Sequence, residues 1–405
     1  MTTISTDLLG QNQPVYRIRD DAEAIAISQK LALEFTQEAS ERDQQRRLPA
    51  AEIHRFSASG LWGITVPRQY GGAEVSLVTL AEVFKIISEA DPCIGQIPQS
   101  HFYSVEVLRL TGNEAQKQFF FERVLEGDRF GNAATEIGVK TTEDILTRIE
   151  RSGEGHLLNG RKFYSTGALL ADWIPVVARQ EDDRKVMAFV EKSANGLTIV
   201  DDWSSFGQRT TASGTTLLEN VYVPATWVIP NYLAFEQITP IGAFAQIIQA
   251  AIDAGIAKAA LRDTINFVRA HTRPWIDSNH DHGYEDELLI YEFGRLQIQV
   301  HAAESLLQRS GEFLDRARAN PTEITVAEAS IAVAEAKALT TEAAIQATNK
   351  LFELAGTKST LQQFNLDRHW RNGRTHTLHD PVRWKYYTVG NYFLNNVLPV
   401  RHAYI

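Results

Sequence analysis

Hydrophobic and polar residues follow two different periods along the chain, and the period changes twice. From about residue 20 to 125, apolar side chains recur at three- and four-residue spacing among charged ones, which predicts helices. Between about 130 and 230, short apolar runs such as Trp173–Val177 and Val186–Val190 predict strands. From Pro240 onward, long Ala-rich and amphipathic segments predict helices again.

This order of elements predicts three domains. We expect an N-terminal helical domain over 15–129, a middle β domain, barrel or sandwich, over 130–236, and a C-terminal four-helix bundle over 237–405. The fold class is therefore α+β and mainly α. Within the β domain we expect a hairpin turn at Asn159-Gly160, because this dipeptide favours the backbone conformation that tight turns need.

Charge and cysteine content narrow the class of protein. The 405 residues carry 40 Lys and Arg against 50 Asp and Glu, and this net charge of −10 argues against a nucleic-acid binder. One cysteine, Cys93, excludes a disulfide scaffold and suits a reducing compartment. The start, Met1–Pro14, is polar, and we find no uncharged apolar run of about 18 residues. We therefore expect no signal peptide, no membrane span and a cytoplasmic location.

Several common cofactor motifs are absent from the sequence. No G-x-G-x-x-G motif follows a predicted strand, which argues against a dinucleotide-binding unit. Gly356–Thr360 is similar to the end of a nucleotide-triphosphate loop but lacks the leading glycine and the strand before it. His376 and His379 have the spacing of a helical metal pair, but no Glu-x-x-His motif accompanies them. We expect no metal site.

Three local clusters carry side chains suited to chemistry. Residues 131–136 are small and polar, so that backbone N–H groups could approach a ligand, although a plain domain linker has the same composition. Residues 159–167 end in Ser165 and Thr166 beside a glycine, which are also common residues at a strand end. Residues 371–381 hold two histidines, two arginines and an acid, suited to proton exchange near neutral pH or to a solvated charged surface.

The sequence resembles the acyl-CoA dehydrogenase superfamily over nearly its full length. The order of the three domains is similar, and three motifs carry the resemblance. They are Trp62–Pro67 with Tyr70-Gly71-Gly72, the Asn159–Lys162 segment ahead of Ser165, and Leu354–Thr357. Three further stretches resemble a branch of flavin-dependent monooxygenases that includes dibenzothiophene monooxygenase and the sulfur-acquisition oxidoreductases. These stretches are Asp202–Gly214, Thr272–Trp275 and Arg374–Pro381.

The chain departs from the dehydrogenases of this superfamily at one chemically decisive place. Those enzymes need a carboxylate base that removes an α-proton. In one common arrangement, this carboxylate lies in a Tyr-Glu-Gly-Thr segment past the glycine-containing flavin loop. Here the region reads His376 to Pro381, and its only acid, Asp380, precedes a proline. Because some members carry the base elsewhere, a flavin-linked acyl-CoA dehydrogenase stays the alternative. A non-catalytic binding relative is a third interpretation.

The resemblance implies a monooxygenase that uses reduced FMN and O₂ through a flavin C4a-hydroperoxide. The substrate would be a small organosulfur compound, and a separate NAD(P)H-dependent reductase would supply the reduced flavin. FAD is the alternative cofactor. A cofactor completed by a neighbouring subunit would make the protein an obligatory oligomer, and we expect a homotetramer.

The resemblance also implies roles for individual residues. His379 would be the acid–base group and Ser165 a donor near the flavin N5, with His101 and Tyr103 on the substrate side. His101 is alternatively a surface or helix-capping histidine, and Trp203 a core residue. The resemblance also implies that Asn132, Thr135, Trp203 and His376 contact the flavin. Arg273 and Gly356 would reach the flavin phosphate from a neighbouring subunit.

Overall fold

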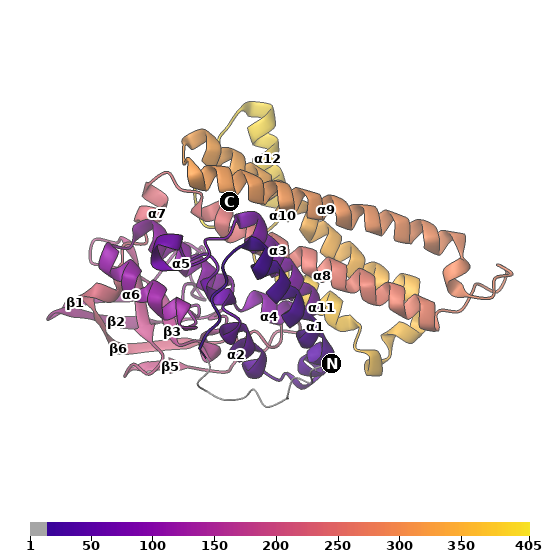
Figure 1. Ribbon diagram of the computed structural model, residues 1–405, viewed down its shortest axis with the longest axis horizontal. Coiled ribbons are helices and arrows are strands. Elements are labelled where there is room, and N and C mark those ends of the chain that lie inside the picture. The colour runs from indigo at the N-terminus through magenta and orange to yellow at the C-terminus, as the bar shows by residue number, and fades with distance from the viewer. Residues whose placement is uncertain (1–13) are drawn as a thin grey trace.

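The computed structural model describes residues 14–405, and most of the polar start Met1–Pro14 therefore lies outside the described residues. Helices form the N-terminal part, as the periodicity predicts (Figure 1). They are α1 (Asp21–Gln45), α2 (Ala50–Ala58), α3 (Leu77–Ala90), α4 (Pro92–Gln96), α5 (Gln99–Thr111) and α6 (Glu114–Leu125). Side-chain caps explain several helix starts: Asp20, Ser76 and Asn113 each accept a backbone N–H of the first turn.

The middle part is a seven-stranded, mostly antiparallel sheet in the order β5-β6-β2-β1-β3-β4-β7. The strands are β1 (Arg148–Ser152), β2 (Gly155–Lys162), β3 (Trp173–Arg179), β4 (Lys185–Glu191), β5 (Leu197–Ile199), β6 (Thr216–Pro224) and β7 (Val228–Ile229). One face of the sheet packs against the main hydrophobic core, which contains residues of α3 and α8. The other face contributes to a smaller hydrophobic cluster formed mainly by strand residues.

The predicted turn at Asn159-Gly160 is wrong. These residues lie inside β2, and β1 and β2 are instead joined at Gly153, whose φ of +60° a glycine adopts readily. Asn159 bonds across to Asn220 of β6 through its side chain. A Cβ on Gly160 would lie 2.3 Å from the Thr147 hydroxyl oxygen, so the glycine permits close approach at a bulge.

The C-terminal part is a helical bundle around a long buried helix. Its helices are α8 (Ile241–His271), α9 (Glu287–Ala319), α10 (Glu323–Ala355), α11 (Asp367–His376) and α12 (Arg383–Asn395), with the short α7 (Leu233–Glu236) before them. Helix α8 has the length and hydropathy of a membrane span, but 94% of its most apolar window is buried, as in a core helix. The predicted α+β, mainly α fold class is confirmed.

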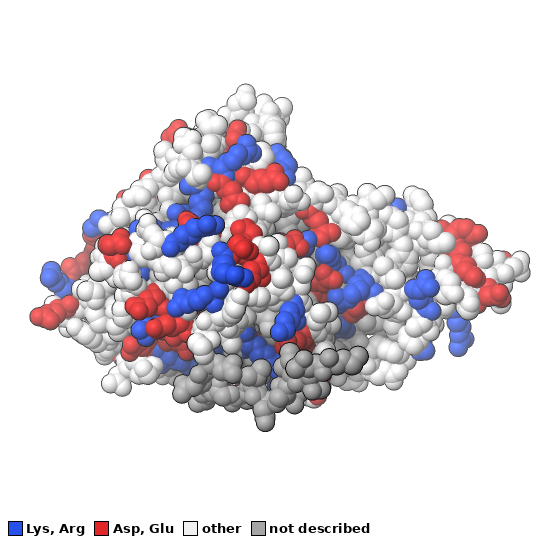
Figure 2. All heavy atoms as spheres, viewed as in Figure 1, with Lys and Arg blue, Asp and Glu red and all other residues white. Residues whose placement is uncertain are grey.

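Figure 2 shows acidic and basic side chains interspersed on one face of the molecule, without a broad field of either sign. Exposed apolar side chains instead gather on the C-terminal helices. On α9 they include Leu288, Ile290, Tyr291 and Ile298, and on α12 they include Trp384, Tyr387, Phe393 and Leu394. Large exposed apolar side chains gathered on the same helices suit contact with another molecule.

Candidate functional site

A cavity of about 140 Å³ lies where the helical domains meet the sheet, and it opens into a wider hollow of about 820 Å³ that includes solvent space. Its lining comes from helix α5, the segment before β1, the first turns of α8 and the C-terminal tail, with further residues from β3, β4, the segment at α7 and the turn after α11. The residues of this cavity that concern the chemistry are Tyr103, Asn132, Thr135, Asn231, Gln246, Gln249, His379 and Tyr404. The structure thus brings together four residues predicted from the sequence: Tyr103, Asn132, Thr135 and His379.

His379 lies in the turn after α11 and reaches the cavity with a partly exposed side chain. Its Nδ1 lies 3.3 Å from Asp380 Oδ1, and the second carboxylate oxygen lies 3.2 Å from Lys385 Nζ. Burial alone would raise the pKa of Asp380, but the hydrogen bond to His379 and the nearby lysines outweigh it and hold the pKa far below its usual value. The ionised Asp380 therefore keeps the proton on Nδ1 and leaves Nε2 free for chemistry.

The C-terminal tail forms part of the cavity wall beside His379. Lys385 Nζ donates to the Tyr404 carbonyl at 2.6 Å, and Gln246 Nε2 donates to the Ala403 carbonyl at 3.1 Å. The final residue, Ile405, is buried. Tyr103 lies on the same cavity, and burial raises the pKa of its phenol well above the usual value, so that it keeps its proton.

Ser165 lies at the end of a strained turn next to the cavity segment. Tyr164 before it has a φ of +56°, which a non-glycine residue adopts rarely. Its neighbour Thr166 bonds to the Ser213 hydroxyl at 2.7 Å, and Ser213 bonds on to Thr211, also at 2.7 Å. The Ser165 hydroxyl is fully buried, yet it has no hydrogen-bond partner among residues 14–405. A buried hydroxyl without a partner in a fixed turn is a candidate for contact with a ligand.

The segment 131–136 connects the Ser165 turn to the cavity. The Asn132 amide donates to the Tyr164 carbonyl at 2.9 Å, and the Asn132 backbone N–H donates to the Thr166 carbonyl at 3.2 Å. Lys162 fixes the end of the segment through a buried ion pair with Glu136, 2.7 Å between Nζ and Oε1. The segment is therefore more than a domain linker, because its polar groups hold the Ser165 turn in position.

Trp203 lies beside this turn rather than in the cavity wall. Its ring centroid lies 6.0 Å from that of Tyr164 and 6.3 Å from that of Phe163, and its indole N–H donates to the Gln208 carbonyl. The ring is half-buried. A contact with a flavin held against Ser165 stays a prediction for Trp203.

His376 does not line the cavity but supports a residue that does. Its Nε2 lies 2.8 Å from the Gln249 amide oxygen, and its Nδ1 lies 2.5 Å from Asp253. Lys337 Nζ lies 2.7 Å from the same carboxylate. Burial alone would raise the pKa of Asp253, but the charge of Lys337 and the hydrogen bond with His376 outweigh it and lower the pKa to about 2. His376 is thus placed behind the site, as part of a buried charged network.

The expected role of His101 on the substrate side needs correction. The ring is fully buried, with Nε2 2.9 Å from the Trp62 carbonyl and Nδ1 3.1 Å from the Phe130 backbone N–H. Burial lowers the pKa of His101 to about 3, so that it stays neutral. Both nitrogens are used within the fold, and the ring packs edge-on against Trp62. His101 therefore joins helix α5 to its neighbours and is not among the residues that line the cavity.

Arg273 and Gly356 lie together at the opposite end of α8, which is the right-hand end of the bundle in Figure 1. Both are exposed, and Thr272 Oγ1 joins their two segments by donating to the Ala355 carbonyl at 3.1 Å. From Gln249 to His271 the helix rises about 33 Å at 1.5 Å per residue. These two residues therefore cannot reach a ligand in the cavity of their own chain.

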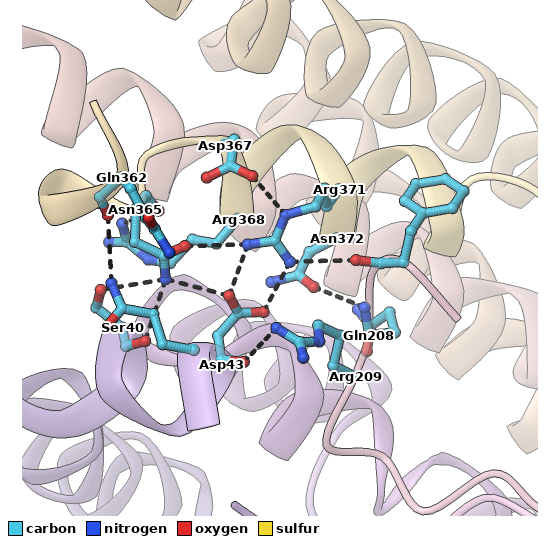
Figure 3. A network of polar contacts seen from close by, with 12 residues as sticks. Ser40, Asp43, Gln208, Arg209, Gln362, Asn365, Asp367, Arg368, Arg371 and Asn372 are labelled. Carbon is cyan, nitrogen blue, oxygen red and sulfur yellow. Dashed lines mark hydrogen bonds and ion pairs between the residues drawn. The ribbon is translucent and has the colours of Figure 1, made fainter. Parts of the chain in front are cut away.

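A polar network joins the three domains (Figure 3). Arg371 of α11 holds Asp43 of α1 with two contacts of 2.6 and 3.1 Å, and it also bonds Asp367 and the Phe206 carbonyl. In the same network Asn372 accepts the backbone N–H of Gln208 at 2.7 Å. We call this group the three-domain junction, defined by Asp43, Gln208, Arg209, Asn365, Asp367, Arg371 and Asn372.

The residues present fit a flavin. Its ring needs donors on fixed backbone and a dry, partly apolar wall, and the Ser165 hydroxyl is a buried donor for which the described part of the chain offers no partner. Of the described residues that line the cavity, Glu143 is the only carboxylate, and it is paired with Lys185. A free carboxylate base is therefore absent from this part of the lining.

Sequence reasoning did not identify several residues of the cavity. Gln246 and Gln249 have a recognisable signal, since two polar residues three apart interrupt the otherwise apolar first turns of α8, Ile241 to Ile252. Ala403 and Tyr404 have none, because no local pattern says where a chain end docks.

Three domain models of the acyl-CoA dehydrogenase family match the chain: the N-terminal domain over 24–128, the middle domain over 131–221 and the C-terminal domain over 247–384. A dibenzothiophene monooxygenase of Rhodococcus qingshengii is 31% identical over 94% of this chain and 95% of its own length. A probable FMNH2-dependent monooxygenase, SfnC of Pseudomonas putida, is 28% identical over 94% of this chain and 97% of its own length.

Solved structures agree with these matches. The FMN-bound structure of TdsC from Paenibacillus sp. A11-2 has a TM-score of 0.90 and 28% identity, covering 94% of this chain and 100% of that one. The methanesulfinate monooxygenase MsuC from Pseudomonas fluorescens has a TM-score of 0.87 and 27% identity, covering 94% and 99%.

Proposed function

This chain belongs to the acyl-CoA dehydrogenase family, and from that premise we propose that it is a monooxygenase that uses reduced FMN and O₂ to oxygenate a small organosulfur compound. The proposal rests on its relatives and on one observation of the site. The imidazole of His379 lines the cavity, and the one carboxylate in the described lining is paired with Lys185. An α-proton base, which a dehydrogenase needs, has no counterpart there.

Reduced FMN supplies two electrons to O₂ when bound, so that one oxygen atom enters the substrate and the other leaves as water. The chain's own residues supply binding, orientation and proton transfer. Ser165 would donate its unpartnered hydroxyl to the flavin ring, and the Thr135 hydroxyl lies on the same cavity. Asn132 would act through the Ser165 turn, because its side chain is already bonded to the Tyr164 carbonyl.

His379 would hold and deliver a proton at Nε2, since Asp380 engages Nδ1. Tyr103 would act as a neutral hydrogen-bond donor toward the substrate. The tail residues Ala403 and Tyr404 would keep water out of the cavity, because their carbonyls are tied to α8 and α12. Exclusion of water strengthens these hydrogen bonds and protects reactive intermediates.

We infer that the enzyme is a homotetramer in which Arg273 and Gly356 serve the flavin phosphate of a neighbouring subunit. Both lie too far from their own cavity, and the guanidinium of Arg273 suits bidentate contact with phosphate. The exposed apolar residues of α9 and α12 offer the surface for assembly. A separate NAD(P)H-dependent reductase would supply the reduced flavin in the cytoplasm. Light scattering that gives a monomer would contradict the shared site.

The test of the function is an assay of the purified protein with chemically reduced FMN, O₂ and a panel of small organosulfur compounds. We expect an oxygenated sulfur product. The same protein loaded with flavin is mixed with acyl-CoA esters without O₂. Bleaching of the flavin by a thioester would instead establish the dehydrogenase alternative.

A further inference from the structure

A fully buried lysine lies behind the cavity, and the chemistry described above makes no use of it. Lys337 of α10 is 0% exposed, and its Nζ lies 2.7 Å from Oδ2 of Asp253 on α8. Thr341, one turn further along α10, donates its hydroxyl to the same oxygen at 2.7 Å. Burying both charges costs free energy that their attraction often fails to offset, so this pair is a candidate for a role other than stability.

The second oxygen of Asp253 fixes the position of a proton on His376. Asp253 Oδ1 lies 2.5 Å from His376 Nδ1, and the low pKa of Asp253 keeps the carboxylate ionised. Burial lowers the pKa of His376, so the ring is neutral and carries one proton. An ionised carboxylate only accepts hydrogen bonds. The proton therefore stays on Nδ1, and Nε2 keeps a lone pair.

This lone pair decides how the Gln249 amide is turned. The amide oxygen stands 2.8 Å from His376 Nε2, but two atoms with lone pairs form no hydrogen bond. A half-turn of the amide about its last bond places the NH₂ group at the same point, where it donates to Nε2. The other end of the amide is buried, belongs to a side chain that lines the cavity, and has no partner among the described residues. The carbonyl oxygen of Gln249 is therefore turned to the cavity.

A second carbonyl oxygen lies on the same side of the cavity. Gln246 precedes Gln249 by one turn of α8, and its Nε2 donates to the Ala403 carbonyl at 3.1 Å. Because a carbonyl only accepts, this amide cannot be reversed, and its Oε1 is buried without a partner within residues 14–405. Both glutamines line the cavity together with His379. The α8 side of the cavity thus presents two acceptors, which suit a group that donates.

We propose that the Gln249 oxygen accepts a hydrogen bond from the O–H of a hydroperoxide derived from O₂. Lys337, Asp253 and His376 are then positioning residues that keep this oxygen turned to the cavity. The inference rests on the proposed function. In that reaction, reduced FMN gives two electrons and two hydrogens to O₂. The O–O bond breaks as one oxygen atom bonds to the sulfur lone pair, and the other oxygen leaves as water with both hydrogens.

An acceptor is the group that this step needs. The oxygen that sulfur attacks has to keep its proton, because a peroxide anion repels the sulfur lone pair. Carbonyl oxygens bond to O–H but have no hydrogen to give to an anion, so they favour the protonated form. Sulfides, sulfoxides and sulfinates carry lone pairs and no O–H or N–H, and none of them satisfies these acceptors. The flavin ring does carry N–H groups, and the test distinguishes that partner.

The first measurement needs no flavin. The ¹⁵N resonances of histidine-labelled protein, with those of His376 assigned by their loss in His376→Gln, report which ring nitrogen carries the proton. We expect Nδ1–H in the wild type. In Lys337→Met the Asp253 carboxyl should take up a proton and donate it to Nδ1, which moves the ring proton to Nε2. An Nε2–H ring or an imidazolium in the wild type would overturn the proposal, and an unchanged ring in Lys337→Met would remove Lys337 from it.

The second measurement is the ratio of hydrogen peroxide to oxygenated product at saturating reduced FMN. It is made with methanesulfinate, dimethyl sulfoxide and dibenzothiophene, together with the Kd for FMN, in the wild type and in Gln249→Leu. We expect the ratio to rise about tenfold in Gln249→Leu, as for the loss of one hydrogen bond, with an unchanged Kd for FMN. Gln249→Met keeps the length of the side chain and serves if the leucine variant does not fold.

Gln116→Leu is the matched control. Gln116 of α6 is also buried, and its amide donates to the Thr226 and Val228 carbonyls at 3.0 Å, outside the cavity lining. Its ratio should stay within about twofold of the wild type. An unchanged ratio in Gln249→Leu would overturn the proposal while keeping the proposed function. So would a raised Kd for FMN with an unchanged ratio, which assigns Gln249 to the flavin ring. Failure of the wild type to oxygenate any of the sulfur compounds would contradict both.

Discussion

The three-domain junction and the cavity are both polar and largely buried, but they differ in how completely their polar groups are paired. At the junction, the Asp43 carboxylate meets Arg371 and Asn365, and Arg371 has further oxygen partners (Figure 3). Only the side-chain amide of Gln208 lacks partners among the described residues of this junction. Around the cavity, the described structure leaves one side-chain atom without a partner in each of Asn231, Gln246 and Gln249, and the Ser165 hydroxyl in the neighbouring turn has none either. The paired groups of the junction hold domains together, whereas the unpaired atoms beside the cavity are candidates for contact with a ligand.

The two histidines His101 and His379 repeat this difference. Both rings are held by the protein, but His101 uses both nitrogens on backbone groups, whereas His379 is engaged at Nδ1 and reaches the cavity. The comparison predicts that substitutions in paired regions change stability, and that substitutions at unpaired groups change ligand binding or turnover.

The largest effect is expected at the junction. Arg371→Ala would leave the buried Asp43 carboxylate without its main partner and should lower the free energy of unfolding by about 3–5 kcal/mol. Denaturant titration measures this change. Arg148→Ala is the control, because it removes an exposed pair with Asp183 and should cost less than about 1 kcal/mol. Equal losses in the two variants would contradict the structural role of the junction.

The next effect falls on turnover. His379→Ala should reduce oxygenation about 100-fold and increase the release of hydrogen peroxide, because general acid–base catalysis contributes at least that much. Its free energy of unfolding should change by less than about 1 kcal/mol, since the ring is one-third exposed. Product yield and peroxide are measured in the same reaction. An unchanged product yield would remove His379 from the chemistry.

Behind the cavity, Asp253 should make stability depend on acid. Its pKa is lowered to about 2 in the folded protein, from 3.8, so its stabilisation is fully present above about pH 4 and disappears as the pH falls towards 2. The expected loss is about 2 kcal/mol. The difference in unfolding free energy between wild type and Asp253→Asn, measured from pH 5 to pH 2, should therefore shrink. A constant difference would contradict the lowered pKa.

The smallest effects on stability and FMN binding are expected from substitution of two neighbouring serines, Ser165 and Ser213. Ser165→Ala should leave stability within about 0.5 kcal/mol and weaken FMN binding up to about tenfold, because its hydroxyl has no partner in the described chain. Ser213→Ala breaks two hydrogen bonds and should cost about 1–2 kcal/mol in stability. Calorimetry and flavin titration provide both measurements. The opposite pattern would mean that Ser165, not Ser213, is the structural residue.

The elements could be predicted from sequence wherever a single period dominates. Helix α10 (Glu323–Ala355) lies in the Ala-rich sequence after Pro240 that predicts helices, and its apolar residues and its cap at Thr322 are local signals. The Asn159-Gly160 prediction failed because the strand pairing of β2 with β6 overrides the preference of that dipeptide. Local signals therefore define elements better than they define pairings.

Within the site, the residue types could be predicted but not all the environments. His379 and Tyr103 reached the cavity as expected, while His101, two positions before Tyr103, turned into the core. On a helix, residues two apart point to different sides, and only the tertiary packing decides which side is the cavity. The tail residue Tyr404 could not be predicted, because its docking depends on contacts with distant helices.

The most direct test of the central claim is the fate of O₂. The purified protein is incubated with reduced FMN, ¹⁸O₂ and methanesulfinate or dimethyl sulfoxide, and the mass of the product is measured by mass spectrometry. The account predicts one ¹⁸O atom in each molecule of sulfonate or sulfone, and less label in the His379→Ala variant. The proposed monooxygenase function would be contradicted if every sulfur compound supplied stays unlabelled and all the ¹⁸O is recovered as hydrogen peroxide.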